Sequence, residues 1–252
     1  MGLPLDLGLV REGERLETLQ YGDLRILQKE KAFHYGTDAV LLADFAAPRA
    51  RERMLDLGTG TGVIALLMAS RQENARCVAL EIQPEMADMA ARSVHLNALQ
   101  ERIEVRCADF CQAHRELGCE KYTLAVCNPP YGKAGSVLLS QTEPLRIARH
   151  EGDCTIAEVC QAAFRLLQNG GRFCVVFPAP RMLELMRAMQ EARLEPKRVR
   201  TVHHRAGQPP KLVLVEAVKS GRPTLHWMAP LVLEEEDGAP TAEYRRIYRM
   251  DG

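Results

Sequence analysis

Short apolar runs alternate with longer amphipathic segments through the middle of the chain. The compact runs have the length of strands, and the segments after them carry apolar residues at helical intervals. This pattern predicts strands at 51–58, 76–82, 102–109, 122–128 and 172–178, and helices at 63–71, 84–99 and 159–168. Such alternation indicates a parallel sheet with helices on both faces.

The pattern changes after residue 178. A helix is expected at 183–194, followed by two strands, 196–204 and 211–218, with only a turn between them. Two consecutive strands without a helix indicate a reversed strand. We therefore predict an α/β fold with a seven-stranded, mainly parallel sheet and one reversed edge strand. A small N-terminal extension (1–44) would precede the main domain (45–221), and a tail (222–252) would follow it.

Composition narrows the class of protein. Of the 252 residues 46% are apolar, and Lys plus Arg equal Asp plus Glu at 33 each, so a polyanionic partner would need a local basic patch. The eight cysteines form no CxxC pair and are expected to be reduced core thiols, without a metal, in a cytoplasmic protein. The sequence contains no apolar stretch of membrane-spanning length. No feature fixes the oligomeric state, and we expect a monomer.

The tip of the first predicted strand carries the sequence DLGTGTG. Gly58, Gly60 and Gly62 would let the backbone turn sharply and approach a ligand, with Asp56 just ahead of them. A plain strand-to-helix corner remains an alternative for such a turn taken alone. The G-x-G-x-G spacing differs from the G-x-G-x-x-G of dinucleotide sites, which favours a ligand without phosphates.

Acidic residues stand at the next two strand tips as well. Glu81, with Ile82 beside it, can accept hydrogen bonds from both ribose hydroxyls, while Asp109 can take the amino group of an adenine next to Phe110. Each acid alone is more often an ordinary turn residue. Three at successive tips favour a nucleoside pocket, and an adenosine with a charged appendage in place of phosphates describes S-adenosylmethionine.

The fourth tip reads NPPY, at residues 128–131. The Asn128 side-chain oxygen and the Pro129 carbonyl can accept both N–H bonds of a planar amine, which draws its nitrogen toward a tetrahedral, nucleophilic shape. Pro129 and Pro130 would hold these acceptors in place, Tyr131 would stack on the base, and Asn128 would also border the cofactor. A proline-rich loop explains the prolines but not the Asn and Tyr that flank them.

These motifs resemble a known group of enzymes. DLGTGTG, LEIQ, CAD and NPPY together look like a class I S-adenosylmethionine-dependent methyltransferase with a Rossmann-like fold. The flanking segments FHYGTDAVLLADFA, IARHE, EPKRVR and VEAVKSGRP are similar to the bacterial tRNA adenine-N6 methyltransferase-like family, whose characterised members modify valine tRNA next to the anticodon. The resemblance implies that residues 1–44 cover the cofactor site, with Tyr35, Thr37 and Asp38 near the methionine end. A plain capped helix is the alternative for these three.

The substrate would be held elsewhere. Residues 196–215 contain no acid, and their cations form a candidate phosphate-binding patch, although a charged sheet edge is an equal alternative. The long loop after NPPY is a candidate lid. The candidate substrate-binding residues are Lys133, Arg149, His150, Lys197, Arg198 and Arg200.

Three functions remain open on the residues. The first is N6 methylation of an adenine in tRNA, in the anticodon loop. The second is methylation of a protein glutamine amide, or of another RNA, because such groups present the same planar amine to NPPY. The third is a binding protein that keeps the fold without turnover, against which Asn128 and Tyr131 argue. The glycine spacing disfavours an NAD-dependent oxidoreductase.

Overall fold

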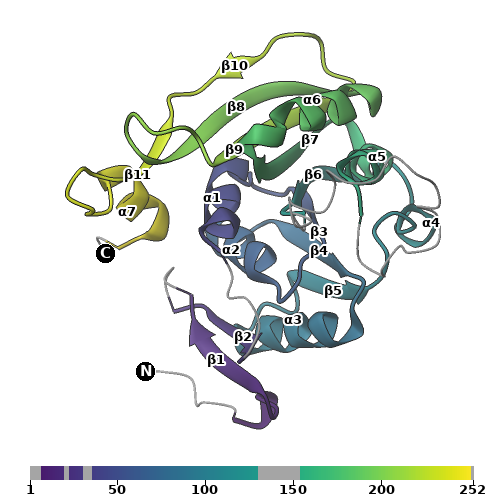
Figure 1. Cartoon of the computed structure of the whole chain (residues 1–252). Helices are drawn as coiled ribbons and strands as arrows, with labels where there is room; N and C mark the ends of the chain where they lie inside the picture. Colours follow the sequence, from purple (N-terminus) through teal and green to yellow (C-terminus); the bar gives the residue numbers. More distant parts are fainter. Residues whose placement is uncertain (1–6, 20–22, 31–35, 130–153, 251–252) are drawn as a thin grey trace, which may run out of the picture.

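One large twisted sheet forms the centre of the molecule in the computed structural model (Figure 1). The structure describes residues 7–19, 23–30, 36–129 and 154–250, and within these ranges nine strands join in the order β10-β8-β9-β7-β6-β3-β4-β5, with β11 also paired to β8. The strands are β3 (Arg53–Leu57), β4 (Arg76–Glu81), β5 (Ile103–Cys107), β6 (Tyr122–Cys127), β7 (Leu167–Pro178), β8 (Leu194–Arg205), β9 (Leu212–Lys219), β10 (His226–Trp227) and β11 (Leu231–Glu234).

The reversed strand lies inside the sheet. β9 pairs antiparallel with β7 on one side and with β8 on the other, so the expectation of a reversed edge strand was wrong in position. The tail adds β10 and β11, both parallel to β8, which raises the count from the expected seven strands to nine. These two strands have only two and four residues, too short for their periodicity to be recognised in the sequence.

Helices cover both faces of the sheet and bury the central strands on both sides. On one face, the helices α1 (Thr37–Ala46), α2 (Val63–Arg71) and α7 (Ala242–Tyr248) pack against the sheet in one hydrophobic core. The helix α3 (Pro84–Leu96) contributes Val94 to the same core. The other core gathers α4 (His114–Leu117), α5 (Ile156–Leu166) and α6 (Met182–Glu191). Met54 and Leu55 of β3 point into opposite cores, as a pleated strand buried on both faces requires. The three-layer α/β architecture predicted from the sequence is confirmed.

Local signals set the helix starts. Thr155 and Glu158 form a capping box at the start of α5: the Thr155 hydroxyl oxygen accepts from the Glu158 N–H at 3.3 Å, and the Thr155 N–H donates to the Glu158 carboxylate at 2.9 Å. Pro84 occupies the first turn of α3. The helix α5 ends at Leu166 rather than 168, because β7 begins at Leu167 and pairs with Tyr122 of β6.

A buried arginine ties the sheet to α1. Arg172 of β7 is 6% exposed and donates to the Ala46 carbonyl at 2.8 Å, to Glu216 of β9 at 2.9 Å and to Glu52 at 2.9 and 3.0 Å. Although burial acts to lower it, the carboxylates and Cys174 keep the pKa of Arg172 above its ordinary value. The network fixes the C-terminal end of α1 against the sheet and so sets the position of its N-terminal end.

The N-terminal hairpin of β1 (Glu14–Thr18) and β2 (Arg25–Lys29) packs on α3 (Figure 1). Arg92 donates to both oxygens of Glu14 at 2.6 Å, and the Ser93 hydroxyl accepts the Leu27 N–H at 3.0 Å. Two short 3₁₀ turns, Leu7–Leu9 and Ala179–Arg181, complete the regular structure of the described residues. No helix within the described ranges is long and apolar enough to cross a membrane.

Candidate functional site

Asp56 shapes the glycine turn between β3 and α2. Its carboxylate is fully buried, accepts the Thr59 hydroxyl at 2.6 Å and accepts the Ala65 N–H at 3.2 Å, while Gly58 and Thr59 both donate their N–H to the Leu80 carbonyl. Burial raises the pKa of Asp56 to about 7. Its Oδ1 has no hydrogen-bond partner among the described residues. The structure thus gives the acid that we expected to bind cofactor a role in holding the turn.

The turn is free of side chains where a ligand would approach. Gly58 and Gly60 have φ of +75° and +58°, which glycine adopts without strain. Within the described part of the molecule, a Cβ on Gly60 would meet nothing within 4 Å, and one on Gly58 would meet only the Phe110 ring, at 3.9 Å. Phe110 therefore lies beside the turn, as the nucleoside pocket predicted from the sequence requires.

Glu81 is fixed at the next tip, directly beside the turn. It is 6% exposed, its Oε2 accepts the Gly60 N–H at 2.9 Å, and its Oε1 accepts the Gln83 N–H at 2.9 Å. Each carboxylate oxygen has a second lone pair, so Glu81 can still accept the two hydroxyls of a ribose. Ile82 is 49% exposed and offers an apolar surface suited to the face of a purine.

The third tip carries Asp109 and a pair of thiols. Asp109 Oδ1 accepts the Cys111 N–H at 2.8 Å, which closes a short turn after β5. The Cys111 and Cys154 sulfurs lie 3.9 Å apart, and this hydrogen bond lowers the pKa of Cys111 and raises that of Cys154. Sequence reasoning treated all cysteines as core thiols and missed this pair. Its only sequence signal is position: Cys111 lies two residues after the CAD motif, and Cys154 directly precedes Thr155.

Asn128 and Asp38 meet at the end of β6. The Asn128 side-chain N–H donates to Asp38 Oδ2 at 3.2 Å, so the first turn of α1 reaches the NPPY motif. The structure therefore brings together two predicted site residues from distant parts of the chain. Thr37 is the first residue of α1, and Pro129 follows Asn128 within the described range. The predicted site residues Tyr35, Pro130, Tyr131, Lys133, Arg149 and His150 lie outside the described residues.

The arginines of the predicted basic patch have partners within the chain. Arg198 donates to both oxygens of Glu216, at 3.1 and 2.8 Å, and Arg200 donates to Glu243 at 2.7 Å. Lys197 donates to the Arg222 carbonyl. Despite burial, which acts to raise it, hydrogen bonds from the arginines lower the pKa of Glu216. The two arginine–glutamate pairs balance charges that the window 196–215 left unbalanced, because Glu216 directly follows the window and Glu243 comes from the tail.

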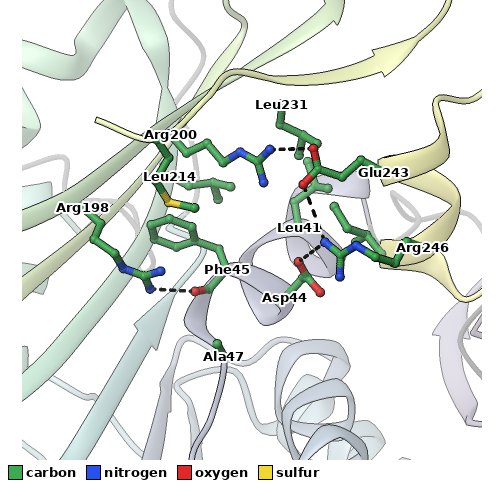
Figure 2. Close-up of a pocket in the computed structure, with 12 residues that line it drawn as sticks. Leu41, Asp44, Phe45, Ala47, Arg198, Arg200, Leu214, Leu231, Glu243 and Arg246 are labelled. Carbon is green, nitrogen blue, oxygen red and sulfur yellow. Dashed lines mark hydrogen bonds and ion pairs between the residues drawn. The ribbon is translucent and has the colours of Figure 1, made fainter. Parts of the chain in front are cut away.

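Figure 2 shows the Arg200–Glu243 pair, together with the hydrogen bond that Arg198 donates to the Phe45 carbonyl at 3.1 Å. Arg198 and Arg200 point into a cavity of about 200 Å³ between α1, β8 and α7, and Arg246 reaches in from α7. Arg246 lies 3.6 Å from Asp44 and 3.7 Å from Glu243. The tail thereby supplies charges that fix it to α1 and to the sheet.

The tips of β3, β4, β5 and β6 together form a site that fits S-adenosylmethionine. The glycine turn leaves space for a ligand, and Glu81 has free lone pairs beside it. Phe110 and Ile82 offer apolar surface to an adenine. Beneath the turn, Asp56 Oδ1 is buried and has no hydrogen-bond partner among the described residues, which leaves one polar atom of the site unused. Among the described residues, no His, Cys, Asp and Glu form a cluster that would hold a metal ion.

This fold and site define the class of protein. A family model described as methyltransferase small domain matches residues 30–201, and the chain belongs to that family. The model covers every strand from β3 to β7 and most of β8. The turn, the acids and Asn128 therefore all lie within the part of the chain that the model matches.

Particular relatives are enzymes named tRNA1(Val) (adenine(37)-N6)-methyltransferase. The enzyme from Bacteroides fragilis strain YCH46 is 32% identical over 196 residues, which cover 78% of this chain and 81% of that enzyme. The one from Phocaeicola vulgatus is 34% identical over 184 residues, which cover 73% and 76%. A solved structure of a predicted O-methyltransferase from Agrobacterium tumefaciens is 26% identical, with a TM-score of 0.71 over 84% of this chain and 96% of that one.

Proposed function

We propose that the protein transfers a methyl group from S-adenosylmethionine to the N6 amine of an adenine in tRNA. The observation that carries this proposal is Asn128 at the tip of β6, beside the glycine turn of β3 and with its amide N–H directed to Asp38. Relatives named as tRNA adenine-N6 methyltransferases support both the base and the class of RNA. Their names specify adenine 37 of a valine tRNA, and we propose the same base, in the anticodon loop, for this chain.

The amine needs activation because its lone pair is delocalised into the purine ring. The Asn128 oxygen and the Pro129 carbonyl would accept its two N–H bonds and turn the lone pair out of the ring plane. When bound, S-adenosylmethionine would supply an electrophilic methyl group on a sulfonium. The lone pair that Asn128 and Pro129 expose would form the new N–C bond, the C–S electron pair would stay on sulfur, and the amine proton would pass to water. Asn128 and Pro129 need only accept hydrogen bonds, and no strong base is required.

The cofactor would be held by the first three tips. Glu81 would accept the ribose hydroxyls, and Ile82 and Phe110 would border the adenine, with Asp109 near its amino group. The glycine turn would approach the methionine part. We retain Tyr35 and Thr37 as proposed contacts at that end, on the resemblance of their segment.

The tRNA would approach the edge of the sheet where these tips lie. Strand β8 is parallel to β7, so the turn between β8 and β9 stands at the same edge as Asn128. Lys211 in that turn is exposed, and its side chain has no ion-pair partner within the described ranges. We propose phosphate contacts there, together with Lys133, Arg149 and His150 after the NPPY motif. Arg198 and Arg200 would support this surface through their ion pairs rather than bind phosphate alone.

The experiment that tests the function uses nucleoside mass spectrometry. The protein and S-adenosylmethionine are incubated with an unmodified valine tRNA transcript, and with a matched transcript whose adenine 37 is replaced by guanine. We expect N6-methyladenosine only from the first transcript. Asn128→Ala should lower the rate at least ~100-fold, the scale of losing one preorganised hydrogen bond to the reacting group. Cofactor affinity, measured by calorimetry, should be nearly unchanged in that variant.

Other outcomes would redirect the proposal. Equal product from both transcripts would reject adenine 37 as the target base but retain N6 methylation of adenine as the reaction. Absence of N6-methyladenosine from total unmodified tRNA, with cofactor binding intact, would reject tRNA adenine as the substrate. In that event the glutamine amide of a protein is the next acceptor to test, because its planar NH2 presents the same two N–H bonds to Asn128 and Pro129.

A further inference from the structure

Asp38 and Asn128 form a contact whose chemistry fixes the orientation of the Asn128 amide. The Asn128 Nδ2 lies 3.2 Å from Asp38 Oδ2. This carboxyl oxygen accepts the hydrogen bond, so the NH2 group of Asn128 faces it. The Asn128 Oδ1 then points away from Asp38. If the amide were turned over, two acceptors would face each other and Asn128 would present N–H groups in the place of its oxygen.

Asp38 is itself held firmly. It lies in the first turn of α1, a helix with seven buried residues from Ala39 to Ala46. Its Oδ1 accepts the Ala39 N–H at 3.2 Å. Gly36 precedes the helix, and a Cβ there would stand 2.2 Å from Asp38 Oδ1, far inside contact distance. Glycine at position 36 is thus the residue that leaves room for the carboxylate.

We propose that Asp38 is a positioning residue for methyl transfer, which rests on the proposed function above. It holds the Asn128 amide so that Oδ1, and not NH2, faces the amine of the acceptor base. An amine N–H opposite a carboxamide NH2 would be donor against donor, and the nucleophile would be neither bound nor activated. This role differs from the contact with the methionine end of the cofactor that the family resemblance implies for Asp38.

Substitutions at Asp38 separate the two roles. Asp38→Ala removes the acceptor, while Asp38→Asn removes the charge but keeps an oxygen that can accept the Asn128 NH2. For positioning, kcat should fall about 100-fold in the alanine variant, the cost of a misplaced reacting group, with the Kd for S-adenosylmethionine little changed. The asparagine variant should recover most of that loss. Equal losses in both variants, accompanied by weaker cofactor binding, would overturn positioning in favour of a charge contact with cofactor.

Gly36→Ala provides a second test that alters neither side chain of the contact. The new methyl group clashes with the end of a flexible side chain, so the easiest response is rotation of the Asp38 carboxylate away from its place. Folding should survive, which a melting curve checks, because the φ of Gly36 is −85° and suits alanine. We expect kcat to fall in the same direction as for Asp38→Ala. An unchanged kcat would argue against the contact.

A measurement on the protein without RNA keeps this inference separate from the proposed function. The side-chain NH2 signals of Asn128 can be identified in a two-dimensional amide NMR spectrum by their loss in Asn128→Asp. We expect these signals to shift in Asp38→Ala and in Gly36→Ala. Unmoved signals would refute the contact even if the enzyme methylates tRNA. Shifted signals with no methylated adenine would retain the contact and reject the reaction.

Discussion

Replacing Asp56 with asparagine tests the electrostatics of the glycine turn. The Asp56 carboxylate is fully buried beneath the turn, and burial raises its pKa to about 7 from an ordinary 3.8. Asparagine keeps an oxygen that can accept from Thr59 and Ala65, and it places an NH2 where Oδ1 now lacks a partner within the described structure. The substitution therefore removes the ionisation and retains both hydrogen bonds.

The sign of the stability change follows from whether the folded or the unfolded state binds the proton more tightly. Because the folded pKa is raised, the native state retains the proton between about pH 4 and pH 7 while the unfolded chain loses it, so ionisation of Asp56 reduces stability as pH rises through that window. The folded pKa of about 7 lies two pH units above pH 5. Each unit changes the free energy of unfolding by about 1.4 kcal/mol, so ionisation of Asp56 costs about 3 kcal/mol over this range. Asp56→Asn should gain that much stability relative to wild type between about pH 5 and pH 8.

Urea unfolding of both proteins at several pH values is the assay. Other ionisable groups contribute equally to the two curves and cancel in the difference. Glu14→Gln is a control in which stability should change with pH in the opposite direction. The Arg92 hydrogen bond lowers the pKa of Glu14, so the ionised Glu14 stabilises the fold above its ordinary pKa and loses this contribution as pH falls. Wild type and Asp56→Asn curves that run parallel from about pH 5 to pH 8 would refute the argument.

Three further outcomes are expected. Gly60→Ala should weaken S-adenosylmethionine binding at least ~10-fold, because its methyl group would occupy the ligand space. The control Gly207→Ala has an equally open Cβ position and a positive φ, so it should cost only the backbone strain of about 1–2 kcal/mol and leave binding unchanged. Arg172→Leu should destabilise the fold by about 3–5 kcal/mol in urea unfolding, because it leaves buried carboxylates without their shared partner, and a loss below about 1 kcal/mol would contradict the network. Peroxide should join Cys111 and Cys154 in a disulfide, each thiol giving up one proton and one electron as peroxide is reduced to water. Peptide mapping without reductant should detect this disulfide before oxidation at the exposed cysteines. Earlier oxidation of the exposed cysteines would contradict the pairing.

The sequence allowed the strand tips to be predicted because each tip has a local signature. The glycine turn, Glu81 and Asn128 stand directly after apolar runs, and parallel strands bring their carboxyl ends to one edge. In the structure, the Gly60 N–H donates to the Glu81 carboxylate, so the first two tips touch. The role of Asp56 was not foreseeable in the same way, since a buried acid that holds a turn and an exposed acid that holds a ligand give the same sequence.

Charge in the C-terminal third could not be interpreted from a window of sequence. Arg198 finds Glu216 because β9 folds back beside β8, and Arg200 finds Glu243 because the tail returns along the sheet to α1. Both acids lie outside the segment that appeared purely basic. The same reasoning applies to Asp38 and Asn128, 90 residues apart, whose contact exists only once α1 is packed on the sheet. Ion pairs and amide orientations depend on which segments the fold brings together, so the chemistry of this site is settled by packing at least as much as by its motifs.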